Sequence, residues 1–202
     1  MINPPNTKQQ GATLIVALIM LLIITILAVG SMREVTLESR ITANTIEQKR
    51  LLNLADSGLR EAERRFNNTY TAQEPGEGCE LTNKKYPCLV NIAALGLDIN
   101  VLHANPKEFD KIDPSSARAW MPYIGSDIDN PTTLDPTRTI TWNSVPIPSG
   151  EQNSEALNPE YGNLMRGEGT FFYATNSRAQ ATTGTEGSAL LQSTVARVYT
   201  SN

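Results

Sequence analysis

The pattern of hydrophobic and polar positions begins with a long apolar stretch near the N-terminus. From Gln9 to Met32 no residue is charged, and residues 12–29 are almost wholly apolar. A helix that crosses a hydrocarbon core of about 30 Å needs roughly 20 apolar residues. Residues 12–32 reach that length and contain no proline. They therefore predict a membrane-spanning helix.

The helical pattern continues beyond this stretch, because no proline follows it until Pro75. Apolar side chains then recur at spacings of three and four, which places them on one helix face: Leu52, Ala55, Leu59, Ala62 and Phe66. We expect this face to pack on a sheet of the same chain. The charged residues among them are expected to remain solvated: Glu61, Glu63, Arg64 and Arg65.

The region after Phe66 predicts a β-rich head. Three runs rich in Thr, Val, Ile and aromatic residues predict strands: Thr137–Val145, Gly169–Ala174 and Ala189–Tyr199. The Gly/Thr-rich residues 181–188 predict a hairpin loop between the last two strands. Residues 101–136 hold five prolines and predict an irregular surface. The fold class is α+β, in which a long N-terminal helix, membrane-spanning and then amphipathic, packs on a C-terminal antiparallel sheet.

Charge argues against nucleic acid as a direct partner. The formal net charge of the chain is −4, and residues 67–202 hold nine basic and fifteen acidic side chains. A surface that tracks phosphates needs a basic patch instead.

Residues for catalysis or metal binding are few. His103 is the sole histidine, and neither a Gly-x-Ser-x-Gly motif nor a phosphate-binding glycine loop occurs. We predict no enzymatic activity and no cofactor. Asp127, Asp129 and Asp135 form a weak calcium candidate that lacks the Gly and closing Glu of an EF-hand loop. Asx-turns are the alternative interpretation of this cluster.

The start of the chain allows three interpretations. It can be a plain membrane anchor, a signal peptide cut after the triplet Ala28-Val29-Gly30, or a leader cut before the apolar stretch. The apolar stretch exceeds the usual length of a signal-peptide core, and a helical pattern follows it without a turn. Both features disfavour the signal peptide.

The string Gln10-Gly11-Ala12-Thr13-Leu14-Ile15-Val16 resembles the class III signal of type IV pilins and type II secretion pseudopilins. That resemblance implies cleavage between Gly11 and Ala12 by a prepilin peptidase, followed by N-methylation of Ala12. The apolar segment then stays on the mature protein as a membrane anchor and later as part of the filament core.

Two further segments make the chain resemble minor pilins of the PilX family. Residues 54–63, Leu-Ala-Asp-Ser-Gly-Leu-Arg-Glu-Ala-Glu, are similar to a helical pattern of that family, and Leu190–Thr194 resembles its C-terminal strand. The resemblance covers the first third of the chain and its last dozen residues. It implies the lollipop shape of type IV pilins.

One position departs from the pilin pattern. The fifth mature residue is Glu in most pilins, and here it is Val16. In the family this Glu is thought to pair with the terminal amine of a neighbouring subunit, because a charge in an apolar core is costly unless paired. Val16 therefore favours a position at or near the filament tip, with a place in the shaft as the alternative.

The resemblance also suggests how the chain is divided. We expect a leader at residues 1–11, a membrane and filament-core helix at 12–32, an amphipathic periplasmic half of the same helix at 33–67 and a head at 68–202.

Outside the inner membrane the compartment is oxidising, so Cys79 and Cys88 predict a disulfide.

By this resemblance the chain is a minor pilin of a tip-proximal complex that primes type IV pilus assembly and supports twitching motility, adhesion and DNA uptake. Its implied partners are other minor pilins of the PilV, PilW and FimU types, the major pilin, a PilY-type tip adhesin and prepilin peptidase. Two alternatives remain open: a type II secretion pseudopilin of the GspK kind, and a membrane-anchored periplasmic binding protein.

Overall fold

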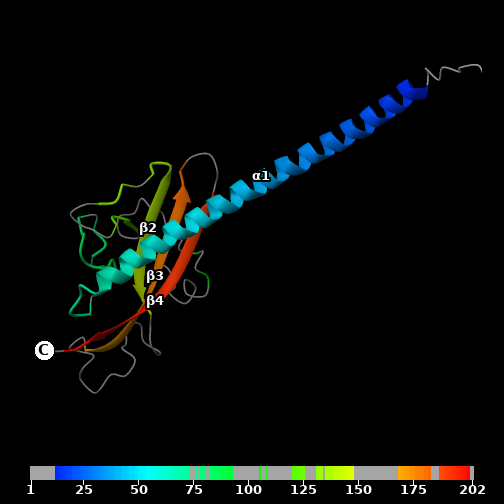
Figure 1. Ribbon diagram of the computed structural model, residues 1–202. Helices are drawn as coiled ribbons and strands as arrows, with labels where there is room; N and C mark the ends of the chain where they lie inside the picture. The colour runs from blue at the N-terminus through cyan, green and yellow to red at the C-terminus, as the bar shows by residue number, and fades with distance from the viewer. Residues whose placement is uncertain are drawn as a thin grey trace, which may run out of the picture. The chain divides into compact units, whose positions relative to one another are not determined.

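The computed structural model describes residues 12–72, 76, 78–80, 82–92, 105, 108, 120–125, 131–133, 135–147, 168–182 and 187–200. Its elements are α1 (Ala12–Phe66), β1 (Met121–Pro122), β2 (Arg138–Pro146), β3 (Gly169–Ala181) and β4 (Ser188–Tyr199) (Figure 1). The chain divides into two compact units, residues 1–46 and residues 47–202. Each unit has its own architecture, and helix α1 contributes to both.

In the first unit, residues 12–46 are helical throughout. Nearly every side chain of this stretch is exposed within the chain. Leu, Ile, Val and Ala dominate its first two-thirds, and the first charged residue is Arg33. The helical interpretation of the apolar pattern is confirmed.

In the second unit the four strands form one antiparallel sheet in the order β1-β2-β3-β4. The register is continuous, from Arg138 opposite Ala181 in the β2–β3 pair and from Gly169 opposite Tyr199 in the β3–β4 pair. The three predicted strands and the β3–β4 hairpin are confirmed. Strand β3 runs seven residues beyond its predicted end at Ala174.

One prediction about residues 101–136 is wrong. Met121 and Pro122 form strand β1, which pairs with Trp142 and Thr141. Trp120 and Met121 are buried, so this part of the segment belongs to the core and not to an irregular surface. Burial of two large side chains there outweighs the turn signals of the surrounding prolines.

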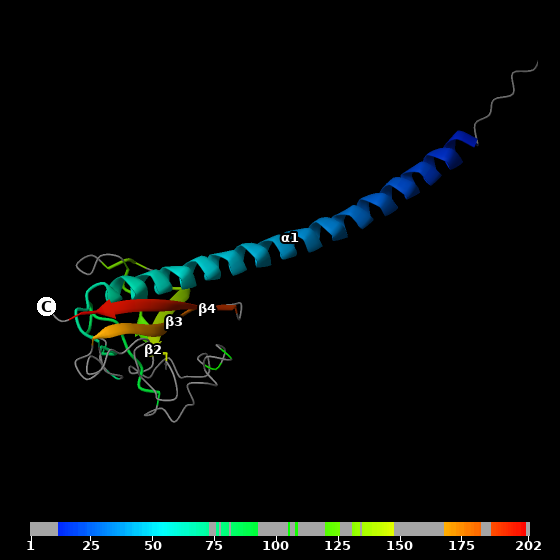
Figure 2. The same ribbon diagram turned by 90° about the horizontal axis from the view of Figure 1, so that it is seen from below.

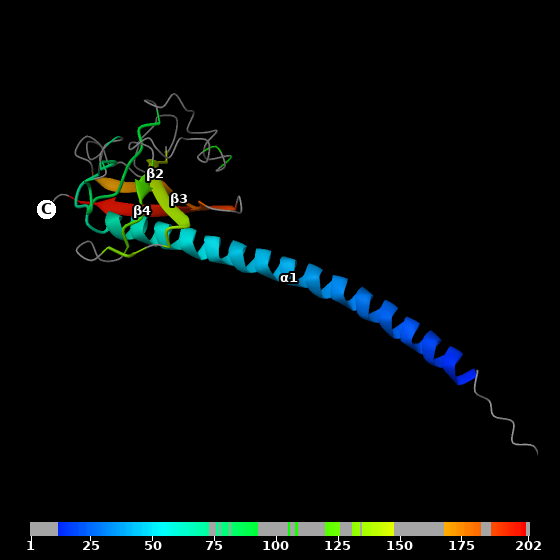
Figure 3. The ribbon, with the colours of Figure 1, turned by 90° about the horizontal axis from the view of Figure 1, so that it is seen from above.

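The C-terminal part of α1, residues 47–66, lies along one face of the sheet, as Figures 2 and 3 show from opposite sides. Small and large apolar side chains alternate in the contact. Ala55 packs with Ile140 and Ala179, and Phe66 packs with Tyr173 and Tyr199. This packing confirms the α+β fold class: a long N-terminal apolar helix and a C-terminal antiparallel sheet.

Candidate assembly site

Two regions of the chain can support association with other proteins: the apolar segment of α1, residues 12–32, and the surface that residues 47–66 form with the sheet. The large apolar side chains from Leu14 to Met32 are 50–69% exposed within the chain. By length and composition α1 suffices to cross a membrane. These side chains are therefore free for lipid or for the helices of other proteins.

Two hydroxyl groups in the apolar segment, those of Thr25 and Ser31, find partners within the helix itself. Thr25 Oγ1 donates to the Leu22 carbonyl at 2.8 Å, and Ser31 Oγ donates to the Leu27 carbonyl at 3.0 Å. A polar group left unpaired in hydrocarbon costs several kcal/mol, roughly. Because these two hydroxyls are paired internally, the helix presents an apolar surface along this stretch. Val16 is exposed like its neighbours.

The predicted packing face of α1 is placed on the sheet, with one correction. Ala55, Leu59, Ala62 and Phe66 are buried, whereas Leu52 is 46% exposed. Leu51 is 3% exposed and takes the place that was predicted for Leu52. Both residues fit the helical period around Ala55, and contact of Leu51 with residues of β2, β3 and β4 decides between them.

At Gly58, α1 lies close against the sheet. A Cβ on Gly58 would meet Ser177 Oγ and would lie 3.0 Å from Ile140 Cγ2. A larger residue fits there only if the side chains of Ser177 and Ile140 shift or the helix moves away from β2 and β3. Gly58 thus fixes the spacing that lets Ala55 and Ala62 pack directly on the strands.

A buried ion pair lies on the same face. Glu61 and Arg65, predicted to be solvated, have side chains that are 1% and 2% exposed, and their carboxylate and guanidinium are 2.5 Å apart. The prediction failed because an (i, i+4) pair of opposite charge is usually a surface feature. Glu61 follows Gly58 by three residues and Arg65 follows it by seven. This spacing places both on the helix face of Gly58 and was the signal available in the sequence.

The Glu61 carboxylate holds the chain that follows β1. Its second oxygen accepts hydrogen bonds from the backbone amides of Ile124 and Gly125, both at 2.8 Å. Gly125 has φ of 105°, a conformation that residues with a side chain rarely adopt. Arg64 donates to the Gly125 carbonyl. Two successive turns of α1 therefore fix this glycine turn.

The Arg65 guanidinium holds the loop between the two cysteines. It donates to the carbonyls of Asn83 at 3.1 Å and Tyr86 at 3.3 Å. Its Cζ atom lies 4.9 Å from the ring centroid of Trp142, within cation–π range. Burial lowers the pKa of Arg65, and the charge of Glu61 opposes that shift. The pair thus joins the helix, the sheet and two loops.

The disulfide predicted from the two cysteines is present between Cys79 and Cys88. Both residues are buried. The Cys88 carbonyl accepts a hydrogen bond from Ser144 N at 3.0 Å, and Val90 N donates to the Ser144 carbonyl at 2.8 Å. The cross-linked loop is therefore attached to β2 through backbone hydrogen bonds.

A second set of ion pairs connects residues 47–50 of α1 with the start of β2. Arg138 binds both Glu47 oxygens, at 2.8 and 2.7 Å, and donates to Asp135 at 2.6 Å. Arg50 binds Asp135 at 3.1 Å. Hydrogen bonding to Arg138 lowers the pKa of Glu47, and hydrogen bonding to Thr137 lowers the pKa of Asp135.

These contacts bear on the calcium candidate. The Asp135 carboxylate is engaged by two arginines and by Thr137. Asp127 and Asp129 lie outside the described residues, as does Gly11 at the predicted cleavage site. Among the described residues no group of three or more His, Cys, Asp or Glu side chains could hold a metal ion.

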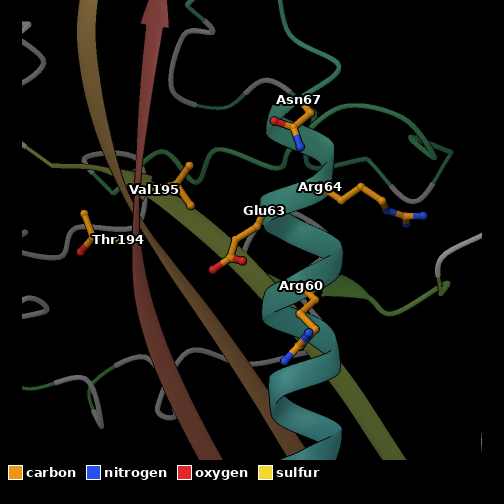
Figure 4. Close-up of a pocket in the computed structure, with 6 residues that line it drawn as sticks. All are labelled: Arg60, Glu63, Arg64, Asn67, Thr194 and Val195. Carbon is orange, nitrogen blue, oxygen red and sulfur yellow. The ribbon is translucent and has the colours of Figure 1, made fainter.

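A shallow groove lies between the last turns of α1 and strand β4 (Figure 4). It is lined by Arg60, Glu63, Arg64, Asn67, Thr194 and Val195. Glu63 points toward β4 and accepts a hydrogen bond from Ser193 Oγ at 2.9 Å. The groove is open and polar, with no catalytic grouping among these side chains.

Comparison with known proteins gives one finding for the N-terminal region. Residues 10–60, a quarter of the chain, match the family model described as PilX N-terminal. No curated protein and no solved structure matches the chain.

Proposed function

We propose that this chain is a minor pilin of the pilus tip, and the match of residues 10–60 to the PilX N-terminal family model supports this proposal. In this role it joins a tip-proximal complex that primes pilus assembly. The complex in turn supports twitching motility, adhesion and DNA uptake. The pilin family is structural, so the function is association and not catalysis.

The observation that carries this proposal is the exposed apolar segment at residues 12–32. Its large side chains are 50–69% exposed within the described part of the chain. Between lipid and a bundle of apolar helices such a segment moves with little change in hydrophobic free energy, because both surroundings are apolar. That property is what a subunit needs when it passes from a membrane into a filament core.

The proposed arrangement has four parts: a leader at 1–11, a membrane and filament-core helix at 12–32, its periplasmic half at 33–67 and a head at 68–202. Lys8 precedes the apolar segment and favours a cytoplasmic start. The head then lies in the periplasm and later on the cell surface. Cleavage at Gly11 and methylation of Ala12 complete the mature subunit.

The proposed tip position rests on Val16. A terminal amine in an apolar filament core is costly unless a neighbouring carboxylate pairs with it. Val16 offers no such carboxylate to a neighbour. A tip subunit has no further subunit to neutralise, so the loss is tolerated there. Contacts with minor pilins of the PilV, PilW and FimU types, the major pilin and a PilY-type adhesin follow from this position.

The mature N-terminus tests the proposal. We would determine it by mass spectrometry on protein from cells with and without prepilin peptidase. A methylated Ala12 that depends on the peptidase is the expected result. A terminus at Ser31 would instead mean a cleaved signal peptide, and an intact Met1 in both strains would mean a plain anchor. Either of these outcomes would overturn the proposal.

A second measurement separates the pilus from a type II secretion system. Deletion of the gene is expected to reduce the number of surface pili while exported enzymes reach the medium as before. Loss of exported enzymes with normal pili would identify a pseudopilin instead.

A further inference from the structure

The loop between the two cysteines is organised around the side chain of Asn83. Its Nδ2 atom donates to the carbonyls of Gly78 and Tyr86, the second at 2.8 Å. Its Oδ1 atom accepts hydrogen bonds from the backbone amides of Lys85 at 3.0 Å and Tyr86 at 2.9 Å. The loop in this conformation presents two carbonyls, those of Asn83 and Tyr86, to the Arg65 guanidinium. The contact with Arg65 therefore depends on the conformation of the loop.

The disulfide fixes the two ends of this loop to each other. The end at Cys88 is held on β2, because its carbonyl accepts a hydrogen bond from Ser144 N. The end at Cys79 is joined to it by the disulfide, and a hydrogen bond from Gly76 N to the Leu89 carbonyl at 2.6 Å lies beside the cross-link. With free thiols the covalent ring is open, and the loop gains conformational freedom. The carbonyls at the centre of the loop are then less restricted in position.

A series of contacts leads from this loop to a turn outside it. One terminal nitrogen of Arg65 donates to the two loop carbonyls, and the other donates to a Glu61 carboxylate oxygen at 2.5 Å. The second Glu61 oxygen accepts hydrogen bonds from the amides of Ile124 and Gly125. Both side chains of the ion pair are at most 2% exposed, so water does not weaken the attraction between their charges. The ion pair thus links the disulfide loop to the glycine turn at Gly125.

We propose that oxidation of Cys79 and Cys88 controls both regions: it orders the loop over Arg65 and, through Glu61, fixes the glycine turn at Gly125. In this step each thiol loses one proton and one electron as the S–S bond forms. The disulfide of an oxidant protein accepts the two protons and two electrons and becomes a pair of thiols. The oxidising compartment in which this happens follows from the proposed function.

The reduced chain is expected to differ from the oxidised one at both ends of this link. Once the loop opens, water reaches the guanidinium of Arg65 and screens its attraction to Glu61. The carboxylate then holds the amides of Ile124 and Gly125 less tightly. Oxidation is a single maturation step and not a reversible switch, because the two cysteines are 3% and 0% exposed in the oxidised head and a reductant does not reach them.

Amide hydrogen exchange tests the proposal on the purified full chain in detergent micelles, resolved by residue with NMR. A variant with both Cys79→Ser and Cys88→Ser, the serine variant, represents the chain before oxidation, because a hydroxyl replaces each thiol. The amides of Ile124 and Gly125 report on the turn. The amide of Asn176 is the reference, since β3 is paired on both sides and its amides exchange when the sheet opens.

The expected result is exchange at Ile124 and Gly125 that is about tenfold or more faster in the serine variant, relative to exchange at Asn176. Arg65→Lys is then added to both chains. It keeps a positive charge beside Glu61 but lacks the planar guanidinium that binds Glu61 and the loop at once. In that background, loss of the disulfide should change the exchange ratio by no more than about twofold, because the link is already broken.

Two outcomes would overturn the inference. One is an unchanged exchange ratio in the serine variant. The other is an equal rise with and without Arg65→Lys, which would mean that the effect passes through Ser144 and β2. If the serine variant does not fold, Arg65→Lys with the disulfide intact decides. It should raise exchange at Tyr86 in the loop and at Gly125 in the turn by about tenfold relative to Asn176, and a rise at one site alone or at neither would also overturn the inference.

Arg60→Lys is the matched control for the lysine substitution. Arg60 also lies on α1 and pairs with an acid four residues away, Asp56, but both side chains are exposed. This variant should leave the effect of the disulfide on the exchange ratio unchanged. The mature N-terminus tests the proposed function separately. Methylated Ala12 together with an unchanged exchange ratio in the serine variant means that this inference fails alone.

Discussion

At the scale of single residues, charge burial sets the strongest constraint on the head. Glu61 and Arg65 carry opposite charges under the helix, and each also makes hydrogen bonds to loop backbone. Removal of charges from water costs free energy that the ion pair and these hydrogen bonds must offset. Truncation of one partner therefore lowers the free energy of unfolding of the head more than the loss of one surface ion pair does.

We predict that Arg65→Leu destabilises the head by about 3–5 kcal/mol, because it leaves the Glu61 carboxylate buried without its counter-ion. Urea unfolding of the unchanged and variant proteins measures this difference. Arg60→Leu is the matched control: Arg60 also pairs with an acid four residues away, Asp56, but both side chains are exposed. It should leave the unfolding midpoint unchanged. Equal effects of the two substitutions would contradict the prediction.

The ion pairs at the start of β2 predict how stability depends on pH. The pKa of Glu47 in the folded state lies below its ordinary value of 4.5, chiefly through Arg138, and that of Asp135 lies below 3.8, chiefly through Thr137. Their stabilising contribution is complete above the unfolded pKa values and is lost as the pH falls through the lowered folded values. The melting temperature should therefore decrease from about pH 5 downward.

Arg138→Gln is expected to reduce this pH dependence, because Glu47 then loses the partner that lowers its pKa. Thermal unfolding of both proteins between about pH 3 and pH 7 measures the difference. Arg40→Gln, on the exposed part of the helix, serves as the control. Parallel pH curves for Arg138→Gln and the unchanged protein would exclude the proposed role of this ion pair.

At the scale of elements, the sequence predicts α1 well and the sheet less well. An apolar run followed by a stripe with spacings of three and four leaves few alternatives to a helix, and α1 spans the predicted residues. The last seven residues of β3 lack such a signal, since Thr175, Asn176, Ser177 and Arg178 are polar and yet buried. Thr175 and Asn176 hydrogen-bond to residues of neighbouring strands, and a local sequence pattern cannot show such partners.

Asn176 shows how these polar residues are accommodated. Its amide donates to Asn143 Oδ1 at 3.0 Å and accepts from Gln192 at 2.9 Å, so three opposed amides cross β2, β3 and β4. Ser144 and Thr175 exchange a hydrogen bond at 3.1 Å beside them. A buried polar group is tolerated when it is paired. Such pairing depends on the register of strands that are far apart in the sequence.

The contact between α1 and the sheet predicts the effect of a single methyl group. Gly58→Ala places a Cβ against Ser177 and Ile140, and overpacking of this kind costs about 1–3 kcal/mol. This cost exceeds the gain of roughly 1 kcal/mol in helix propensity from Gly to Ala. We therefore expect a lower free energy of unfolding for the variant, measured by urea titration.

Gly30 supplies the control for this substitution, because a Cβ there meets nothing within 4 Å in the chain. Gly30→Ala should leave the unfolding of the head unchanged. Adding Ser177→Ala to Gly58→Ala should recover part of the lost stability, since it removes the nearest atom. A Gly58→Ala protein as stable as the original would show that the helix can shift without cost.

At the scale of the whole molecule, the chain combines two units whose roles were predictable to different degrees. The leader motif and the apolar segment pointed to a pilin, and the family match at residues 10–60 agrees with them. The spacing of Glu61 and Arg65 from Gly58 was a signal for the helix face on which they lie, but their burial depends on a loop that folds back from 64 residues away and on the disulfide loop. Local sequence patterns therefore predict the segment proposed for assembly, whereas they do not predict the contacts in the interior of the head.

This division predicts the result of exchanging the apolar segment. If residues 12–32 are replaced by an unrelated membrane helix of equal length, the head should fold and keep the Cys79–Cys88 disulfide, because residues 47–202 hold their own core. Under the proposed function, pilus assembly should fail, because the new helix would lack the side chains that residues 12–32 offer to neighbouring pilins. Counting surface pili by electron microscopy, together with a disulfide assay on the same cells, measures both effects. If residues 12–32 served only as a membrane anchor, the exchange would leave the number of surface pili unchanged. That result would mean that any anchor suffices and that the head alone carries the function.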